Sequence, residues 1–340
     1  MESIVRIGKS YPVTLLLGLL VVIVLQVDSK VIRAYVVPHG SLALDPSHTN
    51  FSNASAKALA SLIHDSLIRV SQDVAAQNPQ VIFLSTPHGI ADLDKFLLYL
   101  NSAAGGVTYA DSCTNATECA YKLQVSLAAN ASMELVQSMR KSHRVSGISA
   151  FGPPASDPPR IKKKVTDDDS GVTLPLAWAE IIPLYYIPRL NTTRVIILSH
   201  PSRRYNHSET MIPELLHLGR SLYLHLEHMP ERVAVIVSAD LAHTHDKDGP
   251  YGFSPTAQPF DDAIGQYLST LDPDALLQTA GGLVSEALSC GYTGLVMLHG
   301  MISEAGLKRW SSNLLVNGHP TYYGMAVAVI KKAPRLPSLV

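Results

Sequence analysis

The chain is marked by short apolar runs rich in β-branched residues, each of which ends in a polar turn. Four of these runs predict buried strands, at residues 31–37, 81–84, 194–198 and 233–237. Near-continuous apolar runs of this length are typical of parallel strands that are covered on both faces.

Helical periodicity fills the intervals between these runs. Apolar residues recur at helical spacing within residues 54–76, so the chain is predicted to open with a β-α-β unit. Similar patterns predict helices at residues 133–139, 212–226 and 260–271. The alternation predicts a single α/β domain with a three-layer α/β/α architecture and a mainly parallel or mixed central sheet.

A histidine follows the carboxyl end of each predicted strand. These residues are His39, His88, His200 and His243. In open α/β sheets, ligands bind in the crevice beyond the carboxyl ends of the strands. We therefore expect the four imidazoles to converge on one site.

Composition narrows the classes of partner. The 340 residues include 27 Lys+Arg, 28 Asp+Glu and 14 His, and the formal net charge is −1. A chain with this balance offers no basic surface for a phosphate backbone, which argues against a nucleic-acid partner. The length is sufficient for one large domain with a substantial core, and it leaves a homo-oligomer open.

The N-terminus predicts targeting. Arg6 and Lys9 precede an apolar run at residues 13–25, which is short for a spanning helix and suits a secretory signal. We expect residues 1–29 to form a signal peptide or a signal anchor, the latter attaching the protein to a membrane; a buried core helix is the alternative.

Residues 30–335 are predicted to form the domain, with an exposed insertion at about 151–170, where Pro-rich and charged segments alternate.

Two further patterns point to a secreted protein or a membrane-anchored lumenal domain. Cys113 and Cys119 bracket a polar stretch and predict a local disulfide, which leaves Cys290 as a free, buried cysteine. Six of the ten asparagines have Ser or Thr two positions later without an intervening proline, an excess over chance that predicts glycosylation. These asparagines are Asn50, Asn53, Asn115, Asn130, Asn191 and Asn206.

Candidate metal ligands stand among the histidines. His39 and His88 lie in matching Pro-His-Gly turns, in which Pro fixes the approach and Gly permits a sharp bend. Two imidazoles and one carboxylate leave coordination positions open for substrate and oxygen. Glu286 lies in an otherwise apolar region, where a metal would compensate a buried carboxylate. The alternatives are hydrogen-bonded loop histidines and a glutamate turned to solvent.

Five short motifs follow one another along the chain. They are Pro38-His39-Gly40, Pro87-His88-Gly89, Ser238-Ala-Asp-Leu-Ala-His243, Gly249-Pro-Tyr-Gly and Glu286-Ala-Leu-Ser-Cys-Gly291. In this order they resemble the catalytic-chain family of the class III extradiol ring-cleavage dioxygenases, over roughly residues 31 to 330. Many members of that family have Asp-His-Gly where this chain has Asp-Ser-Gly at residues 169–171.

The resemblance implies a non-haem Fe(II) held by His39, His88 and Glu286, and insertion of O2 into a catechol-like aromatic ring. It implies His243 as the acid/base that takes a phenolic proton, and His200 as the residue that orients substrate or oxygen. His245, two residues beyond His243, is the alternative base, and Asp240 is expected to orient this loop or to cap the following turn.

The same superfamily includes Memo-like proteins, and a resemblance to these implies a different site. It would bind copper or zinc through His39, His88, His200 and Cys290 without ring cleavage, because thiolate favours Cu(I) or Zn over catalytic Fe(II). Glu286 distinguishes the two, since only the dioxygenase site requires its carboxylate. A zinc-dependent hydrolase with the same ligands is a third interpretation, which no sequence feature favours by itself.

Overall fold

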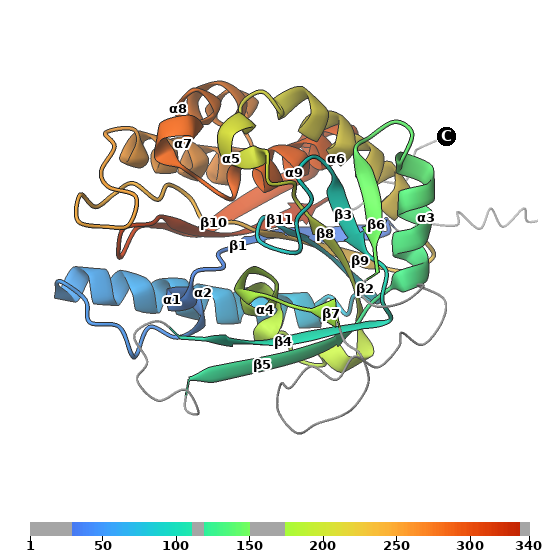
Figure 1. Ribbon diagram of the computed structural model, residues 1–340, viewed down its shortest axis with the longest axis horizontal. Helices are drawn as coiled ribbons and strands as arrows, with labels where there is room; N and C mark the ends of the chain where they lie inside the picture. The colour runs from blue at the N-terminus through green and yellow to red at the C-terminus, as the bar shows by residue number, and fades with distance from the viewer. Residues whose placement is uncertain (1–28, 111–118, 150–173, 334–340) are drawn as a thin grey trace, which may run out of the picture. The chain divides into compact units, whose positions relative to one another are not determined.

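The computed structural model describes residues 29–110, 119–149 and 174–333. They form one α/β domain, in which a mixed eight-stranded sheet lies between two outer layers (Figure 1). The predicted fold class is confirmed. The apolar run at residues 13–25 of the predicted signal or anchor, and the insertion predicted at about 151–170, lie outside the described residues.

The four predicted strands form the centre of the large sheet. In spatial order they are β1 (Val31–Val37), β9 (Val233–Ser238), β2 (Val81–Thr86) and β8 (Arg194–Ser199). Each is parallel to its neighbour, so their carboxyl ends lie at the same edge of the sheet. β2 and β9 are buried along their whole length, because both faces of the sheet are covered.

The strands at the two edges make the sheet mixed. They are β11 (Met325–Lys332) and β10 (Trp310–Gly318) at one edge, and β3 (Phe96–Tyr99) and β6 (Val145–Ile148) at the other. β11 is antiparallel to both β1 and β10. β3 is antiparallel to β8 and parallel to β6.

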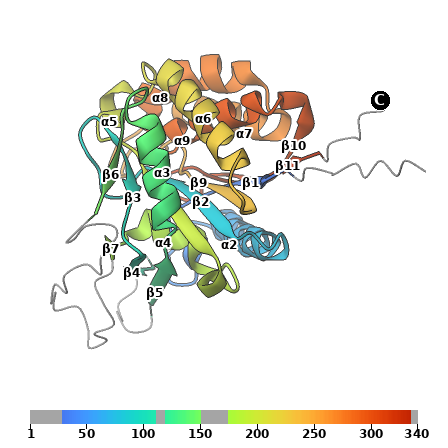
Figure 2. The same ribbon diagram turned by 90° about the vertical axis from the view of Figure 1, so that its right-hand side faces the viewer.

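Each face of the sheet has its own covering layer (Figure 2). One layer consists of α3 (Ala129–Met139), α6 (Ile212–Glu227), α7 (Ala257–Thr270), α8 (Gly281–Ala287) and α9 (Tyr292–Glu304). The other combines α1 (Ser41–Leu44), α2 (Ala54–Ala76) and α4 (Trp178–Tyr185) with a small sheet of β5 (Ala120–Ser126), β4 (Ala103–Tyr109) and β7 (Leu174–Pro175). Shorter turns are α5 (Arg204–His207), a π-helical turn at Ala275–Ala280, and 3-10 turns at Leu190–Thr192 and Leu307–Arg309.

Apolar stripes at helical spacing attach both layers to the sheet. Ile63, Leu67 and Val70 of α2 are buried in one core, as the periodicity predicted. Leu215 and Leu218 of α6 are buried in the other. Each such side chain contributes about 1.5–3 kcal/mol when it is fully buried, so the two cores hold the central strands firmly from both sides.

The prediction of a secreted or membrane-anchored, glycosylated protein is corrected by the structure. Within residues 29–110, 119–149 and 174–333, no helix combines the length and the apolar character that crossing a membrane requires. Nothing in this part of the chain supports glycosylation, and Asn53 has a structural use: its Oδ1 accepts from the Ala56 N–H at 2.9 Å and caps α2. Cys119 is disulfide-bonded, while its predicted partner Cys113 and Asn115 lie outside the described residues.

Candidate metal centre

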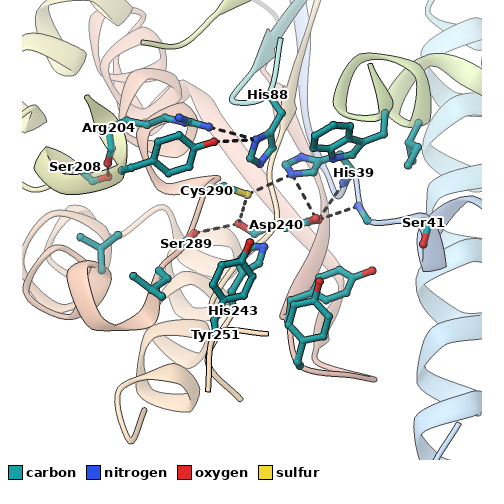
Figure 3. Close-up of a pocket in the computed structure, with 18 of the residues that line it drawn as sticks. His39, Ser41, His88, Arg204, Ser208, Asp240, His243, Tyr251, Ser289 and Cys290 are labelled. Carbon is teal, nitrogen blue, oxygen red and sulfur yellow. Dashed lines mark hydrogen bonds and ion pairs between the residues drawn. The ribbon is translucent and has the colours of Figure 1, made fainter. Parts of the chain in front are cut away.

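A pocket of about 910 Å³ opens beyond the carboxyl ends of the central strands (Figure 3). The two Pro-His-Gly turns contribute His39 and His88, which follow β1 and β2. The segment after β9 contributes Asp240 and His243, and the connection between α8 and α9 contributes Cys290. Of the four histidines that were expected to converge on one site, His39, His88 and His243 do so and His200 does not.

Three of these residues form a compact group of metal-ligating side chains. His39, His88 and Cys290 each offer one ligand atom, and these atoms all lie within 4.8 Å of one another. Nε2 of His39 is 3.2 Å from Sγ of Cys290, and the two imidazole rings meet edge to face with centroids 5.0 Å apart. The site is thus a His/His/Cys group that could hold a metal ion.

Hydrogen bonds behind His39 determine which of its nitrogens faces the group. The Ser238 hydroxyl donates to the Ala179 carbonyl at 2.8 Å, so it must accept from the ring, and Nδ1–H of His39 lies 2.9 Å away. Nε2 then carries the lone pair, and it is the nitrogen that faces Cys290. His39 is held in the tautomer that a metal requires.

Asp240 fixes the first Pro-His-Gly turn. Its Oδ1 accepts from the backbone N–H groups of His39 at 3.0 Å and Gly40 at 3.3 Å. Its Oδ2 lies 3.3 Å from Nε2 of His39, and the side chain is buried. The Asp240 carboxylate thus orients the His39 turn, and its negative charge favours a cation at the centre.

The two turn glycines are required by close packing. A Cβ on Gly40 would lie 2.3 Å from the Tyr323 ring, and one on Gly89 would lie 2.6 Å from Oη of Tyr99. Gly40 has φ −66°, which any residue can adopt, so the sharp bend inferred from the sequence is not the reason for glycine there. Close approach of an aromatic ring is the physical cause.

The charge states in the pocket suit metal binding. Burial, with smaller contributions from Arg204 and His243, lowers the pKa of His88 to about 3. Burial also holds the pKa of His39 well below its usual range. Both imidazoles are therefore neutral at pH 7, the form that coordinates metals. Burial and the nearby Asp240 charge raise the pKa of the Cys290 thiol, so a cation is needed to hold it as thiolate.

His243 lines the pocket beside the group, as predicted. Its Nδ1–H donates to the Leu241 carbonyl at 2.9 Å, which leaves the lone pair on Nε2. Burial lowers the pKa of His243, so the ring is neutral, and it stacks on Tyr323 with centroids 5.8 Å apart. It is a neutral base at the pocket wall.

Glu286 lies outside the group, at variance with its predicted place in the ligand set. Its side chain is exposed and accepts from the Ser254 hydroxyl at 3.5 Å. α8 ends at Ala287, and Leu288 takes a left-handed φ of 56°, which turns the following residues inward. Cys290 consequently occupies the position that was predicted for Glu286, and the alternative of a solvent-facing glutamate is the one observed.

His200 is a core histidine in the structure. It is fully buried, its Nε2 lies 2.8 Å from Oγ of Ser85, and its Nδ1 lies 2.9 Å from Oγ1 of Thr293. Both ring nitrogens are thereby engaged, and His200 does not line the pocket. The prediction that His200 orients substrate is therefore wrong. His200 is also not available as a ligand in a Memo-like metal site.

His245 also faces away from the group. Its Nε2 is 2.8 Å from Oδ2 of Asp261, and its ring stacks on His319 at 3.8 Å between centroids. It does not line the pocket, so the histidine at this wall is His243.

Two important features of the pocket were missed at the level of sequence. Arg204 and Tyr205 of α5 reach Nδ1 of His88 at 3.3 Å and 3.4 Å. The only signal for them was their place just after the end of β8. Aromatic walls were also missed, because the segments that supply them lie far apart in the sequence; they include Trp178, Tyr251, Tyr322 and Tyr323.

Comparison with known proteins provides no named activity. No family model matches the chain. A protein of Clostridium acetobutylicum is 23% identical over 266 residues, which cover 77% of this chain and 50% of that protein, so the chain spans about half the length of this relative. A crystal structure of an uncharacterized protein from Escherichia coli K12 shows 15% identity and a TM-score of 0.49, covering 88% of this chain and 99% of the other.

Proposed function

We propose that this protein binds a zinc or copper ion through His39, His88 and Cys290. The observation that carries the proposal is the convergence of their three ligand atoms within 4.8 Å of one another. Two imidazoles and a thiolate match the preferences of zinc and copper, whereas open Fe(II) centres in oxygenases use two histidines and a carboxylate. Within the superfamily that the motifs resemble, this donor set favours a Memo-like protein.

The surroundings of the group support a metal in this place. Ser238 fixes the tautomer of His39, and Asp240 adds a negative charge 3.3 Å from the coordinating nitrogen. Second-sphere partners of this kind orient ligands in metalloproteins. Three protein ligands beside a pocket of about 910 Å³ also leave a coordination position open for a small molecule.

Removal of single ligands tests this proposal. Full-length protein is loaded with zinc, desalted and assayed for metal by mass spectrometry. We expect one zinc per chain in the wild type and in Glu286→Gln, and loss of zinc in Cys290→Ala and His39→Ala. Glu286→Gln is the matched control, because Glu286 lies four residues from Cys290 but outside the group. Full retention by Cys290→Ala, or loss in Glu286→Gln alone, would contradict the ligand set.

A metal-dependent enzyme is the second candidate, and His243 is the observation that favours it. The ring is neutral and lines the pocket, and its Nδ1–H is donated to the Leu241 carbonyl. A bound metal would polarise a ligand as a Lewis acid, and His243 would accept a proton from that ligand's hydroxyl. The ring-cleaving dioxygenase belongs here, with a small catechol-like substrate and O2. The resemblance implied Fe(II) on His39, His88 and Glu286, of which His39 and His88 lie in the group.

Oxygen uptake decides between the candidates. Protein loaded anaerobically with Fe(II) is mixed with catechol and O2, and consumption is compared between the wild type and His243→Gln. Uptake that falls at least about a hundredfold in His243→Gln would support the enzyme. Absence of uptake from protein that retains its metal would reject the dioxygenase and leave the metal-binding function.

A further inference from the structure

Arg204 is a buried cation at the wall of the pocket, and its guanidinium has no counter-ion among the residues that the structure describes. The residue is 3% exposed, and it forms no ion pair with a carboxylate in the described part of the chain. Nε and Nη1 have no hydrogen-bond partner there. Figure 3 shows the side chain reaching toward His88, whose Nδ1 is 3.3 Å from Nη2.

This arrangement is unfavourable without a ligand. Arginine cannot lose its proton inside a protein, so burial leaves the charge in place. Stacking of the guanidinium on the Tyr205 ring, 3.9 Å from the centroid, compensates part of the lost hydration. The unused donors on Nε and Nη1 still require acceptors, and an anion would provide both the acceptors and the opposite charge.

We propose that Arg204 binds the carboxylate of a small organic anion that occupies the pocket beside the metal group. The proposal rests on the metal site described above and names the class of molecule that this site receives. A carboxylate matches the planar guanidinium and carries one charge. Among the described residues that line the pocket, Arg204 is the only Lys or Arg, and Asp240 and Glu209 would repel a dianion such as phosphate more strongly than a monoanion.

The rest of the pocket fits the organic part of such a ligand. Its volume of about 910 Å³ is far larger than a single inorganic anion needs, and Trp178 and Tyr251 provide apolar wall. Ser41 lines the same pocket, and its buried hydroxyl is a second polar group without a hydrogen-bond partner in the described residues.

Metal and anion should strengthen each other's binding. A guanidinium can only donate, so the Nδ1 lone pair of His88 is occupied by Arg204 when the anion is absent. The Arg204 charge also opposes a cation at the group, because Nη2 of the guanidinium lies only 3.3 Å from Nδ1 of His88. An anion that binds the Arg204 guanidinium would free the Nδ1 lone pair of His88. It would also neutralise the positive charge of Arg204. By linkage, the metal then raises the affinity for the anion by the same factor.

Calorimetric titration of zinc into the full-length, metal-free protein tests the coupling, with benzoate as the anionic probe and benzamide as its neutral counterpart. In the wild type we expect saturating benzoate to raise zinc affinity about tenfold, and benzamide to leave it unchanged. Arg204→Gln should bind zinc more tightly than the wild type without benzoate, and should show no benzoate effect. Arg204→Lys, which retains the charge and is the milder substitution, should show a reduced effect.

Arg203→Gln is the matched control, because the neighbouring Arg203 pairs with Glu214 at 2.6 Å and does not line the pocket. It should behave as the wild type. A benzoate effect that persists in Arg204→Gln, or is absent from wild type that binds zinc, would overturn the inference. An equal effect of inorganic phosphate would overturn the assignment to a carboxylate.

Failure of zinc binding itself would reject the metal proposal and not this one. In that case, binding of benzoate and benzamide to metal-free protein is followed by ligand-observed NMR. Binding of benzoate alone, lost in Arg204→Gln, would support the anion site. Equal binding of both probes, or of neither, would reject it.

Discussion

A chain of two hydrogen bonds on the side of His39 that faces away from the pocket holds its imidazole in the tautomer that binds a metal. Ser238 lies at the end of β9 and connects the imidazole to the Ala179 carbonyl of α4. The second sphere of the metal group therefore belongs to two different elements of the fold. Because the tautomer depends on one hydroxyl, a single residue outside the ligand set should influence metal affinity.

Ser238→Ala should weaken zinc binding by about 10- to 100-fold, the usual cost of removing a second-sphere partner. Ser85→Ala is the control, because it removes the corresponding hydroxyl from His200, which lies outside the metal group. Competition with a fluorescent zinc chelator provides both affinities. Equal losses in the two variants would show that a general packing defect, and not the tautomer of His39, is responsible.

Glu180 is a buried carboxyl that should make stability depend on pH. Its oxygens accept from the Tyr99 hydroxyl at 2.6 Å and the Ala177 N–H at 2.6 Å, yet burial raises its pKa from 4.5 to about 7. Between these pH values the folded state holds a proton that the unfolded state has released. The free energy of unfolding must then fall as pH rises through this window.

The full loss on ionisation is about 3 kcal/mol, given 1.36 kcal/mol per unit of pKa difference. Urea unfolding of the wild type and Glu180→Gln at several pH values measures it. Glu180→Gln should have a lower free energy of unfolding than the wild type at all pH values, because its hydrogen bond is altered. Between pH 4.5 and about 7, however, its free energy of unfolding should change less with pH. Parallel curves for the two proteins would contradict the raised pKa of Glu180.

At the scale of elements, the turns that present the histidines depend on close packing. Gly40 lies under the Tyr323 ring, which also stacks on His243. Gly282 in α8 is the opposite case, since a Cβ there would meet nothing within 4 Å. Replacement of each glycine by alanine therefore compares a position where the added Cβ meets a packed side chain with one where it meets no atom.

Gly40→Ala should lower the free energy of unfolding by about 1–3 kcal/mol and displace His39, because the added methyl group overlaps an aromatic ring. Gly282→Ala should raise the same quantity by about 0.5–1 kcal/mol, because alanine favours the helix. Chemical denaturation measures both. Changes of the same sign in the two variants would refute the packing argument.

The elements that could be predicted from the sequence are those with a complete local signal. The four central strands were found because a strand buried on both faces is continuously apolar, and α2 was found because one face is polar. β4 was missed, since its seven residues include Gly105 and Gly106 and are mostly half-buried. α9 was missed for the opposite reason, because it is apolar on nearly every side and shows no clear period.

The candidate site was predictable to a similar degree. His39, His88 and His243 follow strands that are parallel neighbours, so the topology alone brings them together. The choice between Glu286 and Cys290 depends on the left-handed Leu288 between them, which interrupts helical spacing. A side chain's direction beyond such a residue cannot be derived from periodicity. Arg204 was missed because its burial and the absence of acceptors for Nε and Nη1 among the described residues are visible only in the folded structure.

At the scale of the whole molecule, the metal group connects parts of the chain that are remote in sequence. His39 and Cys290 are 251 residues apart, and they approach from β1 and from the start of α9. A metal bound between them would join the sheet to one covering layer. Its binding energy should then add to the stability of the whole domain.

Zinc at about 100 times its dissociation constant should stabilise the folded protein by about 2.7 kcal/mol, and raise Tm by roughly 5 °C. Differential scanning calorimetry, with and without a chelator, measures the shift. The shift should vanish in Cys290→Ala. An equal shift in that variant would place the stabilising metal elsewhere on the protein.

X-ray absorption at the zinc edge, on the full-length protein loaded with one equivalent of metal, tests the ligand set most directly. We expect one sulfur scatterer at about 2.3 Å and two imidazole nitrogens at about 2.0–2.1 Å. A first shell made only of oxygen and nitrogen would contradict the proposal that His39, His88 and Cys290 bind the metal.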